Sequence, residues 1–163
     1  MVISDENSRP ILIDNIHTPI GVDYFWTLNL EHRDFELAKL EVLEEHSNAP
    51  LLVLNICGYV IEIPADWNVL IFSEETSQLD VAEISELCKG YYSAFVLDHK
   101  KNRQVAGYIN VIDYIPMGTV QIPSINKTQM LCHHLGPNHW ICISPVDNYS
   151  KYLKGATVGD ILP

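Results

Sequence analysis

The stretch from Thr128 to Val146 constrains the fold more than any other part of this sequence. Two apolar runs, 128–135 and 139–146, flank Gly136-Pro137-Asn138, a tripeptide typical of tight turns. Apolar, β-branched and aromatic residues on both sides of such a turn favour a β-hairpin. The stretch also contains two of the four cysteines, three of the seven histidines and one of the three tryptophans. We therefore expect a central hairpin here, and we look for a metal site in the same place.

The rest of the chain repeats the pattern of short apolar runs separated by turn residues. Residues 34–46 have a helix-like composition, but their apolar residues do not form one stripe on a helix, so a strand is favoured. Asp80–Lys89 is the best helix, because its apolar residues fall within one arc. A turn is predicted at Ser47–Pro50, Pro116–Gly118 is expected to end a strand, and 155–163 are predicted to be extended. The other predicted strands are 11–16, 24–30, 51–57, 59–63, 67–73, 92–98, 104–115 and 119–122.

These elements predict a mainly β fold. We expect a barrel or sandwich of short strands with one short helix near 80–89, and an α+β fold is the alternative. A parallel α/β fold requires strands that alternate with helices, and that alternation is missing from the pattern. A chain of 163 residues suits a single globular domain, 1–163, in which the polar residues 1–9 are expected to be loose.

The charge restricts the kinds of partner. The net charge of −11 opposes binding to nucleic acid or to an anionic membrane, since both depend on Lys and Arg meeting phosphate. Residues 1–91 contain 17 acidic and 4 basic side chains, whereas 92–163 contain 4 acidic and 6 basic ones. Such asymmetry either steers basic partners or serves solubility. We expect no signal peptide and no membrane span, and hence a cytoplasmic protein with reduced thiols.

The predicted hairpin brings metal-binding residue types together. With the turn at 136–138, Leu135 would oppose His139 and Cys132 would oppose Cys142. Alternation along the strands then places Cys132, His134 and Cys142 on one face with Trp140, and His133, His139 and Ile141 on the other. Thiolate and imidazole are zinc ligands, but a closed site needs four, and the fourth would come from Cys57 or His99. The alternatives are two cysteines packed as small core residues, which we favour, and a cross-strand disulfide.

Catalytic motifs provide little support for an enzyme. The sequence contains neither a Gly-x-Ser-x-Gly elbow nor a glycine-rich phosphate-binding motif, and nothing fixes the separation of carboxylate pairs such as Asp98 and Asp113. The leading hypothesis is therefore a non-enzymatic β-rich domain that binds a protein partner or associates with itself. One alternative is a metal-binding protein or enzyme that uses the Cys132–Cys142 hairpin. Another is an acidic inhibitor or decoy of a basic protein.

Overall fold

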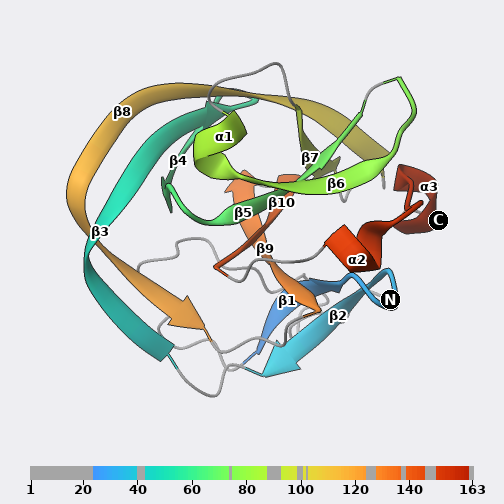
Figure 1. Ribbon diagram of the computed structural model, residues 1–163, viewed down its shortest axis with the longest axis horizontal. Helices are drawn as coiled ribbons and strands as arrows, with labels where there is room; N and C mark the ends of the chain where they lie inside the picture. The colour runs from blue at the N-terminus through green and yellow to red at the C-terminus, as the bar shows by residue number, and fades with distance from the viewer. Residues whose placement is uncertain are drawn as a thin grey trace.

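The computed structural model describes residues 24–39, 43–73, 75–87, 93–98, 101, 103–123, 128–136, 139–145 and 150–161 (Figure 1). The predicted mainly β fold is confirmed. Three helices of four residues each accompany the strands in these ranges: α1 (Ile84–Leu87), α2 (Ser150–Leu153) and α3 (Val158–Ile161). The strands are β1 (Tyr24–Asn29), β2 (Asp34–Lys39), β3 (Leu43–Ile56), β4 (Tyr59–Pro64), β5 (Asn68–Phe72), β6 (Leu79–Glu83), β7 (Ser93–Asp98), β8 (Arg103–Pro123), β9 (Gln129–Gly136) and β10 (His139–Ser144).

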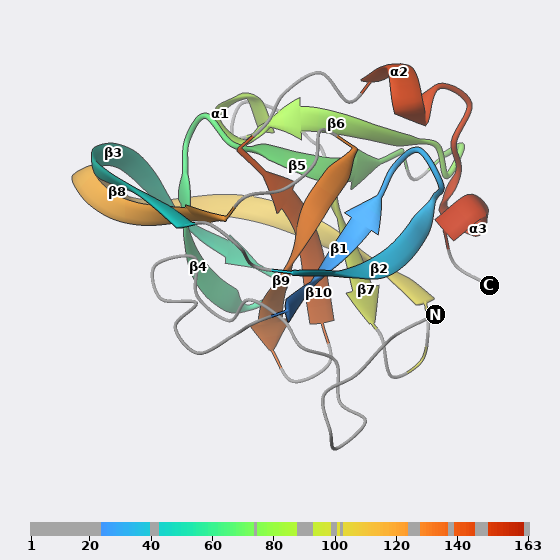
Figure 2. The same cartoon turned by 90° about the horizontal axis from the view of Figure 1, so that it is seen from below.

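All of these strands belong to one antiparallel sheet that folds back on itself in a sandwich-like arrangement (Figures 1 and 2). The order is β2-β1-β9-β10-β5-β7-β8-β3-β4; in addition, β6 pairs with β5 and β7 pairs with β10. No helix in the described ranges is long and apolar enough to cross a membrane.

The central strands are buried on both faces, which explains their nearly continuous apolar sequences. Val69 and Ile71 of β5 enter a first core, whereas Leu70 and Phe72 enter a second. The strands β7, β9 and β10 divide their side chains in the same alternating way. Residues of β3, β4 and α1 complete the first core. Residues of β1, β6 and the C-terminal segment 153–161 complete the second.

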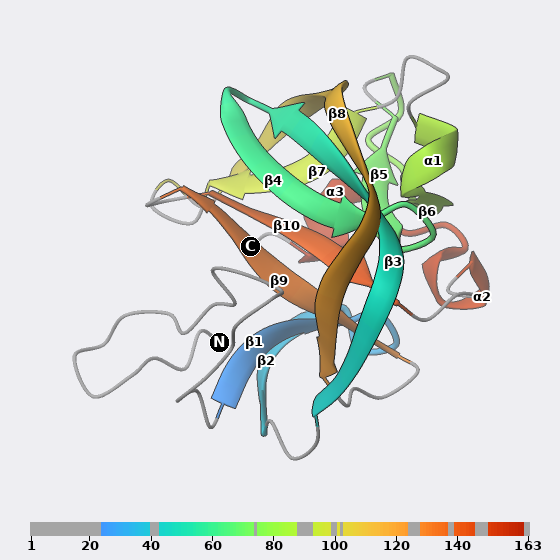
Figure 3. The ribbon, with the colours of Figure 1, turned by 90° about the vertical axis from the view of Figure 1, so that its left-hand side faces the viewer.

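Strand β8 connects the two parts of the sheet. Its first residues, up to Tyr108, pair with β7, and from Ile109 onward it pairs with β3. Strands β3 and β8 then run together as a long curved ribbon at one side of the molecule (Figures 1 and 3). We call residues 43–56 and 109–123 the β3–β8 ribbon. Three register shifts interrupt their pairing, and such bulges increase the bend and twist of a strand.

The long ribbon corrects two predictions. Ser47–Pro50 is not a turn, because β3 continues through it; one of the register shifts falls between Ala49 and Leu51, so Pro50 takes no place in the ladder. Pro116–Gly118 does not separate two strands either, because β8 passes through it at the same irregular point. Residues typical of turns are present in both segments, but they lie at irregularities within continuous strands instead of forming turns.

The helical predictions also change. Residues 80–83 of the predicted helix Asp80–Lys89 belong to β6, and Ile84–Leu87 form the helix α1, whereas 88–89 lie outside the described residues. Pairing with β5 places Leu79 and Val81 against the second core, and this tertiary contact overrides the helical pattern. Residues 155–163 are not simply extended, since they contain α3. The predicted strand over 24–30 is confirmed as β1. The predicted strand over 34–46 contains β2 and the first residues of β3, with 40–42 outside the described residues. The predicted strand 11–16 also lies outside the described residues.

Candidate functional site

The β9–β10 hairpin places Cys132 directly opposite Cys142, as predicted. Both side chains are buried in the second core, where Trp140 stacks on Trp26 with their ring centroids 6.3 Å apart. Burial raises the pKa of the Cys132 thiol well above its ordinary value, and the neighbouring Cys142 raises it further. A neutral thiol in apolar surroundings is a weak nucleophile, so the geometry gives no support to nucleophilic catalysis at Cys132.

The zinc hypothesis for Cys132, His134 and Cys142 stays a prediction. In the backbone register His134 opposes Trp140, but its side chain lies outside those that the structure describes. Among the described residues, no three His, Cys, Asp or Glu side chains form a group that could hold a metal. Cys57, one proposed fourth ligand, lies exposed at the β3–β4 turn. Strands β3 and β4 cover the face of the central sheet that forms the first core, opposite to the face of Cys132 and Cys142. Elemental mass spectrometry of wild type and Cys132→Ser/Cys142→Ser would test the hypothesis directly.

The opposite face of the hairpin agrees with the prediction except at the turn. His133 pairs with Ile141, which lies in the first core. His139 does not oppose Leu135, because a bulge between His139 and Trp140 pairs it with Gly136 instead. The His139 ring lies 5.8 Å from the Tyr59 ring of β4, measured between centroids.

A polar cluster joins β7, β8 and β10 near this turn. The buried Asp98 accepts a hydrogen bond from the backbone N–H of Lys101, and its Oδ2 lies 4.0 Å from Arg103 Nε and 3.9 Å from His139 Nε2. Asp113, the other half of the carboxylate pair considered above, lies ten residues beyond Arg103, about 30 Å along the strand. The two carboxylates therefore do not form an acid–base pair, and Asp98 acts as a clasp between strands.

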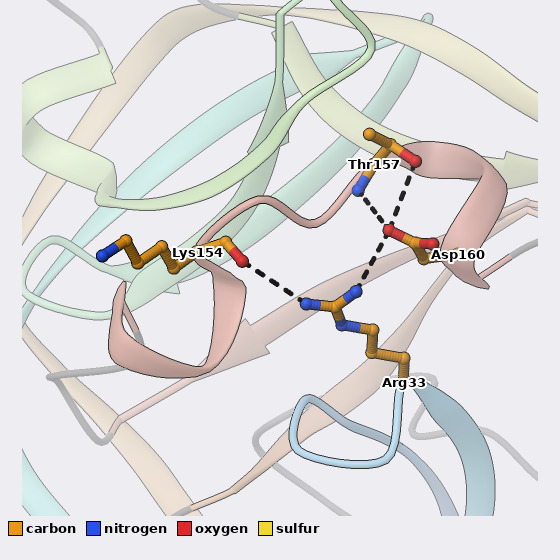
Figure 4. A network of polar contacts seen from close by, with 4 residues as sticks. All are labelled: Arg33, Lys154, Thr157 and Asp160. Atoms are coloured by element: carbon orange, nitrogen blue, oxygen red, sulfur yellow. Dashed lines mark hydrogen bonds and ion pairs between the residues drawn. The ribbon is translucent and has the colours of Figure 1, made fainter.

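A second network of polar contacts joins the β1–β2 turn to the C-terminal segment (Figure 4). We call its residues, Arg33, Lys154, Thr157 and Asp160, the C-terminal clasp. Arg33, which adopts a φ of 57° in the β1–β2 turn, donates to Asp160 Oδ2 at 3.2 Å and to the Lys154 carbonyl at 3.5 Å. Asp160 also accepts the Thr157 backbone N–H at 2.8 Å, which is one half of a helix capping box. These contacts lower the pKa of Asp160, the Thr157 N–H first and the Arg33 charge after it. The network spans 127 residues of sequence, so local pattern analysis did not find it.

The most unusual surface is on β8. Every residue from Asn110 to Met117 is exposed except Ile115, which is half-buried. Since successive side chains of a strand point to opposite faces, both faces of this segment are exposed. Four of the exposed residues are large and apolar, with exposed fractions between 44% and 73%: Val111, Ile112, Tyr114 and Met117. We call these four side chains the β8 surface. Large apolar groups that gather on one exposed segment are typical of an interaction site.

One edge of this segment is not paired with any described strand. From Ile109 onward β8 pairs with β3 on one edge, and no described strand pairs with its other edge (Figure 3). An open edge next to exposed apolar side chains favours association with another chain. The apolar pattern of 104–115 predicts a strand but not its exposure, because the same pattern is expected of a buried strand.

Comparisons with protein-family models, with curated proteins and with solved structures found no match.

Proposed function

We propose that this chain is a non-enzymatic binding domain that recognises a protein through the β8 surface. The observation that supports the proposal most strongly is the run of exposed apolar side chains on one strand with an open edge. Elsewhere in the described sheet such runs are sealed between two cores. A strand exposed on both faces with the composition of a buried strand is best explained by a partner that covers it.

The expected energy of such a contact is substantial. Fully burying an Ile- or Met-sized side chain contributes roughly 1.5–3 kcal/mol, so covering the exposed parts of Ile112 and Met117 would contribute about 2–4 kcal/mol together. Apolar anchors of this kind commonly dominate the affinity of an interface, while the charged residues around them set specificity.

Selection from a random peptide library displayed on phage tests the proposal without a known partner. The selected peptides are measured against wild type, against Ile112→Asn/Met117→Asn, and against Val60→Asn. Val60 is a matched control because it is equally exposed and apolar but lies on β4, with β3 between it and β8. All three proteins should unfold at similar urea concentrations, since only exposed side chains change.

We expect peptides that bind wild type and Val60→Asn alike and bind the double variant at least about ten-fold more weakly. Sedimentation analysis adds a second readout, because a wild-type dimer that the double variant dissolves would also place binding on the β8 surface. If every selected peptide binds the double variant as it binds wild type, and the protein is monomeric, the proposal is wrong.

A further inference from the structure

The open edge of β8 presents backbone groups together with apolar side chains. Beyond Tyr108, where the pairing with β7 ends, an added strand would lie in line with β7 and opposite β3. It would form main-chain hydrogen bonds with β8 and cover apolar side chains on both faces of the edge. This combination is the geometry of strand addition, in which an extended peptide joins an exposed sheet edge.

The edge restricts the length of the added strand. Pro116 lacks an N–H, and it lies within an irregularity of the β3–β8 pairing, between Ile115 and Gly118. Another irregularity lies between Val111 and Asp113. Features of this kind discourage indiscriminate edge-to-edge association. We therefore expect a short added strand of about five residues, the common length of strands in proteins.

The charge of the surrounding strands indicates the class of partner. Beyond Arg103, β8 carries one charged residue, Asp113, and β3 and β4 carry three, all of them glutamates. The register places Glu62 and Asp113 on either side of Val53, in one row across the three strands, so their side chains share a face. Both are exposed. One row of the sheet therefore contains two carboxylates.

The position of Asp113 adds to this argument. Its Oδ1 accepts the N–H of Tyr114 at 2.8 Å, so the carboxylate lies against the β8 backbone beside two members of the β8 surface. A second copy of this chain would bring its own carboxylates to the same place and carries a net charge of −11 as well. Like charges that face each other across a strand pair are destabilising, whereas a Lys or Arg would complement them.

We propose that the open edge of β8 takes up an extended segment of another protein as an added strand, and that Lys or Arg alternates with apolar residues in this segment. The inference rests on the proposed function, since it names the partner of the same surface. The apolar residues cover the β8 surface, and the basic residues meet Asp113.

Synthetic peptides test the inference by fluorescence anisotropy. The probe is a short peptide of alternating Lys and Val, and two controls are the same peptide with Glu in place of Lys and a peptide of equal composition with its Lys residues clustered at one end. Two further versions carry N-methyl groups on the Lys residues or on the Val residues. Because alternate N–H groups of a strand point to opposite edges, only one of these two versions blocks pairing with β8.

We expect the alternating Lys peptide to bind more tightly than both controls and one N-methylated version to lose binding while the other retains it. Asp113→Asn should weaken binding by about two- to five-fold, the contribution of an exposed ion pair, and should reduce its salt dependence. Ser85→Ala, outside the ribbon, is the control that should leave binding unchanged.

Three results would overturn the inference while leaving the proposed function intact. Equal binding of the clustered and alternating peptides would mean general attraction to an acidic protein. Equal tolerance of both N-methylated versions would exclude strand addition. A dimer that Ile112→Asn dissolves would make a second copy the occupant. By contrast, the proposed function itself would be overturned if the phage-selected peptides bound Ile112→Asn/Met117→Asn as tightly as wild type and the protein were monomeric.

Discussion

Substitution of Gly107 by alanine should destabilise the fold where β8 passes from β7 to β3. A Cβ at this position would lie 2.5 Å from Val96 Cγ2 and 3.2 Å from both Ile56 Cγ2 and the Ala94 carbonyl oxygen. Carbon atoms in contact are normally 3.5–4.0 Å apart, so the new methyl group overlaps Val96 by about 1 Å or more. Gly107 therefore leaves room on β8 for Val96 of β7 and Ile56 of β3, the strands on either side of it.

The neighbours have little freedom to move away. Ala94 pairs with Gly107 in the ladder, so its carbonyl is fixed by the sheet. Val96 and Ile56 are fully buried and β-branched, which restricts their rotamers. Overpacking in such a core costs roughly 1–3 kcal/mol. Alanine is better than glycine within a strand by roughly 0.5–1 kcal/mol, which offsets part of this. We expect a net loss of about 1–2 kcal/mol in the free energy of unfolding.

Urea unfolding, followed by tryptophan fluorescence, measures this loss. Gly159→Ala in α3 is the matched control, because its Cβ would meet only Thr157 Oγ1, at 3.8 Å, and we expect equal or slightly greater stability. Val96→Ala in the Gly107→Ala background should make room for the methyl group. The double variant should then be more stable than the sum of the single effects predicts, by about 1 kcal/mol.

Two results would refute the reasoning. An unfolding midpoint for Gly107→Ala at or above that of wild type would show that the strands separate without cost. Strict additivity of Gly107→Ala and Val96→Ala would show that the loss has another origin than the contact between the two side chains.

The other predictions concern the thiols and the C-terminal clasp. In a Cys88→Ser background, Ellman's reagent should label the exposed Cys57 in the native protein, and Cys132 and Cys142 only after unfolding. Rapid labelling of Cys132 and Cys142 in the native protein would contradict the burial of these two thiols. Because the pKa of Cys132 is raised in the folded state, its contribution to stability is present below the ordinary thiol pKa and is lost as pH rises above about 8.5, at up to about 1.4 kcal/mol per pH unit. Urea titrations of Cys132→Ala should show a shallower alkaline loss than wild type, and parallel curves would reject this assignment. The lowered pKa of Asp160 has the opposite sign, so its stabilising effect is present at neutral pH and is lost as pH falls below its ordinary value of 3.8. Asp160→Asn should therefore speed amide hydrogen exchange in α3 at neutral pH, and unchanged exchange would argue against a clasp.

The hairpin shows how far local pattern reaches. The turn residues and the alternation of side chains predicted that Cys132 faces Cys142, and the register agrees. One step nearer to the turn the prediction failed at His139, since a bulge depends on how the turn packs and leaves no mark in an apolar pattern. Whether His134 joins the cysteines around a metal depends on side-chain positions that strand alternation alone does not fix.

Strand β6 and the clasp of Arg33 on Asp160 show where local pattern stops. The apolar residues of the segment 80–83 fit a helical pattern, but the segment pairs with the edge of β5, and Leu79 beside it packs in the second core. The Arg33–Asp160 contact joins residues from opposite ends of the described chain. In both cases the deciding free energy comes from a partner that is distant in sequence.

The sequence by itself determined that this chain forms a mainly β domain, because the periodicity of apolar residues and the placement of turn residues are local properties. It also determined the acidic charge that restricts partners. Only the tertiary structure decided that β3 and β8 are long strands that pair through bulges, and that the apolar run of β8 is exposed while similar runs of β5 and β7 are buried. The physical reason is that an apolar run specifies a strand, whereas the neighbours that cover its faces and edges are set by the path of the whole chain.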